Sequence, residues 1–411
     1  MKLNEGQTFW NVTVDGPVGS IPFVRNVDNP ADVLVVGGGM SGTLTAYALC
    51  EAGLSVILID RGFPGLGSTA ANTGLLQYPS DMSLHESIAE HGRDAAVLFY
   101  QASFEGLQTI KRIAAKLPDK ADLIERDSVC FASNRRDAAS VRAEAKALKK
   151  HGFDAVYLSG RELKKRFGID KPNAFMTKKD SQINPYKFVH GLLQILLKQH
   201  AFRAYHATEY LSQTDRADPG CVQVRTNRGL LYGRHVVMAT GYARDAGSAP
   251  IARKAKRVRS YAIVSEPVAA ASFWPEKVMI WETARPYIYI RHVEGNRILV
   301  GGLDDDVARA PSPRQVRSKA RQLEGRFRDI FPYVPLKTAY AYGGLFGETT
   351  DGLPFIGRHP KLANTYCLYG YGGNGTVYSS IGACLIRDLI LTKTNAYESI
   401  FALDSARLSR R

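Results

Sequence analysis

The 411-residue sequence lacks the marks of several classes of protein. Its five cysteines are odd in number and form no CxxC pair, so we expect neither a disulfide framework nor a zinc site. The nine histidines show no HxH or HExxH spacing, so we predict no metal site. No apolar run approaches the ~20 residues of a membrane span, and residues 1–7 contain no apolar signal segment. We therefore expect a cytoplasmic protein with reduced thiols.

The composition is that of a globular protein with an excess of positive charge. Hydrophobic residues make up 45% and charged residues 23%, and a chain of this length predicts two joined domains. The net charge of +15 would suit a nucleic acid, an anionic membrane or an acidic substrate. Basic residues lie mainly on the polar sides of helical patterns, apart from one dense run of Arg253, Lys254, Lys256, Arg257 and Arg259. We interpret them as a solvated surface and expect no nucleic-acid partner.

Short apolar runs predict a buried parallel sheet. Residues 33–36 and 55–59 are continuous apolar segments, typical of strands buried on both faces, and a helical stretch at 43–51 joins them. Similar runs at 234–239 and 365–369 predict two further strands of this kind. These segments predict an α/β fold with a parallel sheet.

A glycine motif follows the first of these strands. Gly37, Gly39 and Gly42 form a GxGxxG pattern, in which the glycines allow a tight turn, a close pyrophosphate and close packing of helix on strand. Phosphates then lie at the helix N-terminus, and Asp60 at the end of the second strand suits the ribose hydroxyls. The unit predicts a bound dinucleotide and leaves NAD and FAD open.

The remaining chain mixes helical and alternating patterns. Helical periodicity occurs at 92–117, 137–150, 314–331 and 376–391. Between 258 and 302, short alternating segments predict an antiparallel sheet. We find no internal repeat.

Several motifs, in the same order along the chain, resemble the D-amino-acid oxidase superfamily of flavoproteins, which includes glycine oxidase, sarcosine oxidase and D-amino-acid dehydrogenases. They are the unit at 32–60 and the segments 67–74, 236–241, 351–357 and 370–376. The resemblance spans about 31 to 392 and implies FAD, with a GR2-type FAD-binding Rossmann-like domain and an antiparallel-sheet substrate domain. The expected parts are an N-terminal arm (1–30), FAD-binding segments (31–110, 175–250, 345–411) and substrate-domain segments (111–174, 251–344).

The resemblance and the physics of helix ends give the expected cofactor site. The glycine-rich turn at 372–375 precedes a helical pattern, so its backbone can approach the flavin and the helix N-terminus can oppose negative charge there. Residues matching 67–73 run under the flavin in the family. The predicted FAD contacts are Gly37, Gly39, Met40, Ser41, Gly42, Asp60, Arg61, Ser68, Thr69, Gly241, Gly372, Gly373, Asn374, Gly375 and Thr376.

Departures from the family pattern bear on tethering and substrate. The segment 342–347 offers no cysteine where sarcosine oxidase-like members attach FAD, so we expect non-covalent binding. Phe346 and Gly373 occupy the positions of two arginines that hold a substrate carboxylate in relatives. We therefore expect simple α-amino acids to be poor substrates.

Another segment could replace those arginines. In a strand at 285–291, Arg285, Tyr287, Tyr289 and Arg291 would share one face. This face is either a roof over the flavin for an anionic or aromatic substrate or an ordinary solvent-facing side. Tyr287 also matches a pocket tyrosine of the family. Gln77 and Tyr78, just past the flavin loop, are weaker candidates. The predicted substrate-site residues are Tyr287, Arg285, Arg291 and Tyr78.

The expected reaction is oxidation of a C–N bond in a small amine or N-substituted amino acid. Hydride passes to flavin N5, water hydrolyses the imine, and no general base stands out. Oxygen and a carrier both remain open as electron acceptor. Two alternatives are an NAD-dependent Rossmann dehydrogenase and an RNA-directed modifying module of the same superfamily.

Overall fold

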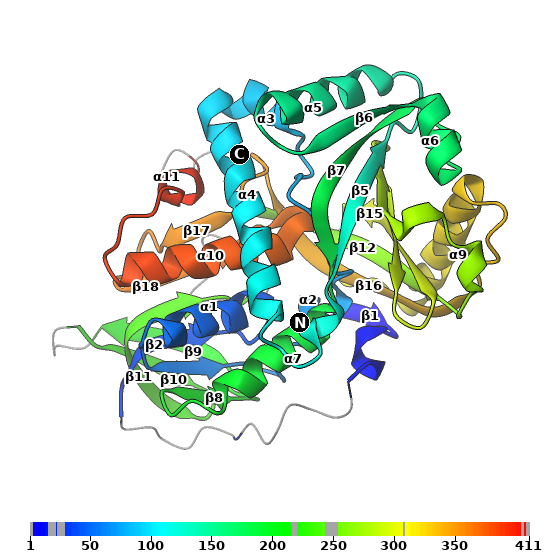
Figure 1. Ribbon diagram of the computed structural model, residues 1–411. Helices are drawn as coiled ribbons and strands as arrows, with labels where there is room; N and C mark the ends of the chain where they lie inside the picture. Colours follow the sequence, from blue (N-terminus) through cyan, green and yellow to red (C-terminus); the bar gives the residue numbers. More distant parts are fainter. Residues whose placement is uncertain are drawn as a thin grey trace.

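The structure, a computed structural model, describes residues 3–14, 22, 29–215, 220–242, 254–306, 309–403 and 407. Figure 1 shows an eight-stranded sheet at the lower left and a ten-stranded sheet at the upper right, with helices packed around both. This arrangement confirms the expected α/β class with a Rossmann-like sheet and a second sheet domain. The predicted segment boundary at 250/251 and Arg253 lie outside the described residues.

The eight-stranded sheet contains the strands expected from the apolar runs. Its order is β17-β18-β11-β2-β3-β8, with β10 pairing with β11 and β9 with β10. The neighbours from β18 to β8 run parallel, and β2 and β3 are buried almost completely because both faces are covered. All four predicted strands are therefore confirmed. The bounds are β2 Ala31–Val36, β3 Val56–Ile59, β8 Phe202–Tyr205, β9 Tyr210–Asp215, β10 Val222–Thr226, β11 Gly229–Met238, β17 Phe355–Arg358 and β18 Thr365–Tyr369.

Helices from distant parts of the chain cover this sheet. Helix α1 packs against α10, which also packs against α4, and the three lie close together in Figure 1. The Ser41 and Ser379 hydroxyls hydrogen bond at 2.9 Å between α1 and α10. The expected helices at 43–51, 92–117 and 376–391 are confirmed. The bounds are α1 Met40–Glu51, α4 Arg93–Ala114, α7 Pro185–Leu196 and α10 Gly375–Ile390, with shorter α2 Ser68–Ala71, α3 Leu84–His91 and α11 Glu398–Phe401.

The ten-stranded sheet is mainly antiparallel, as expected for 258–302. Its order is β1-β16-β12-β15-β14-β13-β5-β7-β4, with β6 pairing with β7, and the pair β13–β5 is parallel. Helix α9 packs on β12, β15 and β16. The bounds are β1 Asn4–Gly6, β4 Leu75–Leu76, β5 Ile124–Phe131, β6 Ala155–Ser159, β7 Asn173–Gln182, β12 Ala255–Ser265, β13 Met279–Glu282, β14 Ile288–Val293, β15 Arg297–Asp305, β16 Thr338–Thr349, α5 Ala138–Lys150, α6 Gly160–Phe167 and α9 Pro313–Ile330.

Several of the expected segment boundaries do not coincide with the ends of helices or strands. The boundaries at 110/111, 174/175 and 344/345 fall inside α4, β7 and β16. The start of the chain also belongs to the second sheet, since β1 pairs with β16. Trp10 is buried and donates from its indole N–H to the carbonyl oxygen of Asn72. Part of the N-terminal arm therefore closes an edge of the substrate-side sheet, although its polar sequence shows no strand periodicity.

Within the described ranges, no helix has the length and apolar character that crossing a bilayer requires. The same part of the chain shows no group of three or more His, Cys, Asp or Glu side chains placed to hold a metal ion.

Candidate active site

The three glycines at the start of α1 are required for different physical reasons. A Cβ on Gly37 would lie 2.3 Å from the carbonyl oxygen of Ala239, and one on Gly42 only 1.8 Å from that of Gly37. Both positions therefore exclude any side chain through protein packing alone. Among the atoms of the described residues, a Cβ on Gly39 would meet only the Thr69 hydroxyl, at 3.4 Å. The space beside Gly39 is left open, as a site for a close phosphate requires.

The N-terminus of α1 is arranged to receive an anion. Gly39 is the N-cap residue of the helix and has no side chain to accept a hydrogen bond from the first N–H groups. The N–H of Met40 donates to the Thr69 hydroxyl at 3.0 Å. Asp60 accepts the N–H groups of Gly38 and Gly62, both at 2.7 Å, which fixes the glycine turn against the end of β3. The helix end and its dipole favour negative charge at this point.

The second glycine turn begins another helix at the border of the two sheets. Gly372–Asn374 form a 3-10 turn that leads directly into α10. The Asn374 amide donates to the carbonyl oxygen of Gln77, and the Asn72 amide donates to the Thr376 hydroxyl at 3.0 Å. These bonds tie α10 to the segment that follows α2. The positive end of the α10 dipole therefore lies beside that segment.

A cleft opens between the glycine turn and the second sheet. One side is formed by polar and small residues of the α2 segment and the glycine turn, and the opposite side is largely aromatic. The lining residues are Ser68, Ala71, Asn72, Thr73, Leu75, Gln77, Pro79, Ser80, Asp81, Tyr242, Ser260, Tyr261, Ala262, Trp281, Tyr287, Tyr289, Tyr342, Gly344, Leu345, Phe346, Gly372, Gly373, Asn374 and Gly375.

Comparison with known proteins identifies the family. The model of the DAO family, described as FAD dependent oxidoreductase, matches residues 32–389. The chain belongs to this family. It is therefore an FAD-dependent oxidoreductase, and the NAD-dependent alternative is excluded as the family's cofactor is FAD.

The relatives are distant but cover most of the chain. The Bacillus subtilis protein YhfW, whose name describes a Rieske 2Fe-2S iron–sulfur protein, is 26% identical over 401 residues, covering 96% of this chain and 75% of its own. Gamma-glutamylputrescine oxidoreductase of Escherichia coli is 24% identical, with coverage of 90% and 86%. Glycine oxidase of Geobacillus kaustophilus superposes with a TM-score of 0.76 at 19% identity, with coverage of 92% and 99%. The last comparison supports the fold.

The residues of this DAO-family protein fit FAD. The open space at Gly39 and the α1 N-terminus suit the pyrophosphate, and Asp60 lies at the adjacent strand end, as a ribose partner must. Ser68 lines the cleft and donates to the carbonyl oxygen of Leu345 at 3.2 Å. No atom of the described residues lies within 4 Å of a Cβ built on Gly241, whose φ is +60°. These contacts with FAD remain predictions. The predicted contact between FAD and Arg61, an exposed residue next to Asp60, also remains a prediction.

The structure brings together only some of the residues predicted for the substrate side. Strand β14 begins at Ile288, so Arg285 and Tyr287 precede it and the expected four-residue face is not one strand. Tyr287 and Tyr289 line the cleft. Arg285 is exposed, lies over the Tyr287 ring at 5.0 Å and donates to the carbonyl oxygen of Asp81. The proposed roof is therefore aromatic, with one arginine beside it.

Arg291 and Tyr78 lie away from the cleft. Arg291 is 2% exposed, lies over the Trp10 ring at 5.1 Å and donates to the carbonyl oxygen of Ile183 at 3.0 Å. Tyr78 stacks on Phe153 with ring centroids 5.6 Å apart. Tyr78 belongs to a hydrophobic core cluster and Arg291 is enclosed by Trp10 and Ile183, and neither lines this cleft. Alternation alone could not show that Trp10 and Ile183 would enclose Arg291.

The structure adds residues that the sequence did not single out. Trp281 and Tyr342 come from β13 and β16, and Tyr242 from the loop after β11. Asp81 follows the flavin-loop segment, and its carboxylate accepts the N–H of Gly373 at 2.8 Å. No local pattern marked these residues, because they meet only when the two sheets pack together.

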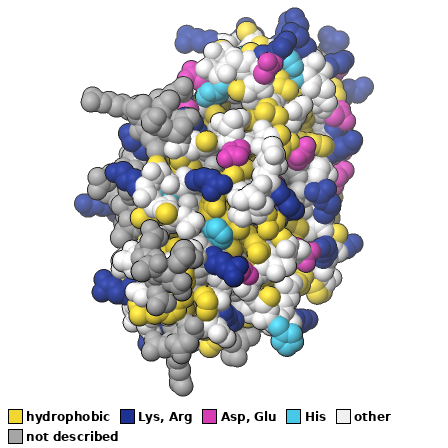
Figure 2. All heavy atoms as spheres, turned by 90° about the vertical axis from the view of Figure 1, so that its left-hand side faces the viewer, with side chains coloured by type: hydrophobic (Ala, Val, Ile, Leu, Met, Phe, Trp, Pro, Cys, Tyr) yellow, Lys and Arg dark blue, Asp and Glu magenta, His cyan; other side chains and the backbone are white. Residues whose placement is uncertain are grey.

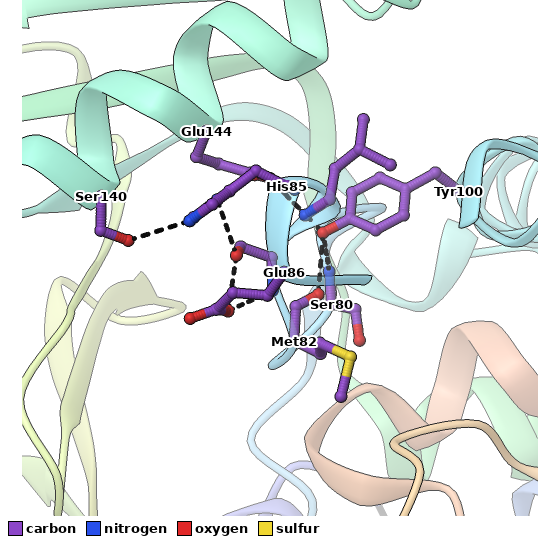
Figure 3. Close-up of polar contacts among 9 residues, drawn as sticks. Ser80, Met82, His85, Glu86, Tyr100, Ser140 and Glu144 are labelled. Atoms are coloured by element: carbon purple, nitrogen blue, oxygen red, sulfur yellow. Dashed lines mark hydrogen bonds and ion pairs between the residues drawn. The ribbon is translucent and has the colours of Figure 1, made fainter. Parts of the chain in front are cut away.

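Asp81 lies in a segment held by a buried polar cluster, drawn in Figure 3. The Tyr100 hydroxyl donates to the carbonyl oxygen of Met82 at 3.0 Å. The buried carboxylate of Glu144 accepts the N–H of Leu84 at 2.9 Å and that of His85 at 3.0 Å. Its contact with the His85 ring raises the pKa of that imidazole. The cluster thus anchors the backbone that follows Asp81 to α4 and α5.

Carboxyl groups dominate the electrostatics near the cleft. Burial, together with the nearby charges of Asp81 and Asp304, raises the pKa of Glu348 to about 7. Burial is also the main reason that the pKa of Asp304 is raised to about 6, although a hydrogen bond with Ser260 opposes the shift. Cation binding nearby would therefore favour ionisation of both groups.

Proposed function

We propose that the protein oxidises the C–N bond of an amine or N-substituted amino acid. The observation that carries this proposal is the cleft, which lies beside the α10 glycine turn and is walled by aromatic side chains. FAD held beside this turn would supply a two-electron acceptor for the oxidation. The E. coli relative is named for gamma-glutamylputrescine and several others for glycine or D-amino acids, which supports a C–N bond as the reacting group.

The side chains of the cleft bind and orient rather than exchange protons. Tyr287, Tyr289 and Trp281 offer apolar ring faces that keep water from the reacting carbon. The amine enters in its neutral form, because a protonated nitrogen cannot support loss of hydride from the neighbouring carbon. Water then attacks the resulting imine, giving a carbonyl compound and the released amine.

Anaerobic mixing with a panel of primary and secondary amines tests this function. A substrate should bleach the flavin band near ~450 nm and yield one carbonyl product per reduced flavin. Matched alcohols and 2-hydroxy acids serve as controls for C–O oxidation. Reduction by the alcohols or hydroxy acids, with none by any amine, would overturn the proposal.

We further infer that FAD is held without a covalent bond. The five cysteines are Cys50, Cys130, Cys221, Cys367 and Cys384, and none belongs to the residues found lining the cleft in the described structure. Acid precipitation should therefore leave the yellow cofactor in the supernatant. Flavin retained in the washed pellet would show that this inference is wrong.

A nucleic-acid partner is still not expected. Figure 2 shows Lys and Arg side chains scattered over the face drawn, between uncharged and hydrophobic groups, rather than gathered in a stripe. Binding of RNA that weakens steeply with salt would favour the alternative function instead.

A further inference from the structure

The charged groups that line the cleft are of one sign. Among the described residues that line it, Asp81 is the only carboxylate, and no Lys, Arg or His is present. A ligand carboxylate would therefore enter beside a negative charge without a lining cation to balance it. A positively charged ligand would instead be attracted by the Asp81 carboxylate.

The carboxylate of Asp81 is positioned for an outside partner. One oxygen accepts the N–H of Gly373 at 2.8 Å, while the other has no hydrogen bond within the described structure. A Cβ on Gly373 would lie 2.8 Å and 3.0 Å from these two oxygens, so the carboxylate occupies the space that a side chain at 373 would need. The backbone is held as well, since Arg285 donates to the carbonyl oxygen of Asp81.

Aromatic rings surround the rest of the cleft. Tyr242, Trp281, Tyr287, Tyr289 and Phe346 contribute to its wall. Ring faces attract cations, and the guanidinium of Arg285 over Tyr287 is an instance at this site. A carboxylate together with several aromatic rings is a suitable environment for an ammonium group.

We propose that Asp81 is a specificity-determining residue that makes the cleft selective for a cationic amine. Its carboxylate and the aromatic rings hold a positively charged group of the substrate, while a second, neutral amine carries the C–N bond to be oxidised. The substrate class is thus an amine with an additional cationic group and no carboxylate beside the reacting carbon. This inference rests on the proposed amine oxidation and concerns which amines are accepted.

Three ligands of nearly the same shape isolate the effect of charge. Choline is cationic, 3,3-dimethylbutan-1-ol is its neutral carbon analogue, and 3,3-dimethylbutyrate is an anion of similar size. Each is titrated into the FAD-loaded protein, and the shift of the flavin absorption spectrum gives the dissociation constant. We expect choline to bind at least about tenfold more tightly than either analogue, which corresponds to ~1.4 kcal/mol.

The variant Asp81→Asn tests the residue itself. Asparagine can still accept the N–H of Gly373, so the fold and the FAD content should persist while the preference for choline falls to within about twofold of the neutral analogue. Asp94→Asn, an exposed carboxylate at the start of α4, is the matched control and should leave the preference unchanged.

The outcomes separate this inference from the proposed function. Binding of choline no tighter than the anion, no binding of choline, or an undiminished preference in Asp81→Asn would overturn it. Because the titration requires no turnover, a clear preference for choline would support it even if no amine were oxidised. Conversely, oxidation of amines with no preference for the cation would leave the proposed function standing alone.

Discussion

The first glycine turn and the substrate cleft differ in how the chain builds them. The turn is made by neighbours in sequence: Gly37, Gly39 and Gly42 lie between two strands, and Asp60 ends the second. The cleft is made by residues as distant as Asp81 and Phe346. A site recognised through backbone N–H groups therefore leaves a local motif, whereas a site recognised through side chains depends on how separate segments pack.

The difference extends to what each region tolerates. Around the glycine turn, a single Cβ is excluded at 1.8 Å by the backbone of the protein itself. In the cleft, the walls are side chains, and their identities set the preference for a ligand rather than the ability to fold. Substitutions in the two regions should therefore affect different properties, as the following predictions specify.

The largest effect is expected from two leucine variants of the first glycine turn. Gly42→Leu should prevent stable folding, because its Cβ would overlap the carbonyl oxygen of Gly37. Gly39→Leu should fold but lose FAD affinity by at least about a hundredfold, since two charge-assisted hydrogen bonds of ~1.5–3 kcal/mol would be blocked. Flavin content and the thermal unfolding of the apoproteins measure the two properties. A yellow Gly39→Leu protein with normal affinity would show that the turn does not bind FAD.

A second pair of variants compares the stability contributions of Arg285 and Arg291. Arg291→Ala should lower the free energy of unfolding by ~2–4 kcal/mol, because a buried cation over Trp10 and its hydrogen bond are lost together. Arg285→Ala, at an exposed position, should change it by less than about 0.5 kcal/mol. Denaturant unfolding measures both values. Equal stability of the two variants would contradict the assignment of Arg291 to packing.

The carboxyl groups near the cleft should make cation binding depend on pH. As pH rises, Asp304 with a pKa of about 6 and Glu348 with a pKa of about 7 lose protons, adding negative charge beside Asp81, with Arg285 and Lys256 as the nearby cations. Choline affinity should therefore increase about five- to tenfold between pH 5 and 8. Glu348→Gln should flatten the upper part of this rise. An affinity that falls with increasing pH would reverse the predicted sign.

The smallest expected effect is a change of choline affinity when Arg285 is replaced. Removing its charge by Arg285→Ala should strengthen choline binding about two- to threefold, because the guanidinium repels a cation near Asp81. Arg285→Lys keeps the charge and is the control. Weaker binding of choline in Arg285→Ala would instead show that this side chain shapes the aromatic wall that holds the ligand.

Features that depend on local periodicity and steric demand could be predicted from the sequence. Four apolar runs became the adjacent strands β18, β11, β2 and β3, and the GxGxxG pattern became the turn before α1. These predictions succeeded because a buried parallel strand needs a continuous apolar segment, and because only glycine fits where helix and strand backbones nearly touch. The family resemblance and FAD followed from motifs of the same local kind.

Which side chains line the cleft depends on contacts between segments that are distant in the sequence. Alternation grouped Arg291 with Tyr289, but Trp10 and Ile183, from two other parts of the chain, enclose the guanidinium. Asp81 is held by a hydrogen bond from Gly373, nearly three hundred residues away, and the backbone that follows it is held by the cluster around Glu144. Such contacts depend on how the two sheets pack, and no periodicity within a single segment records that packing.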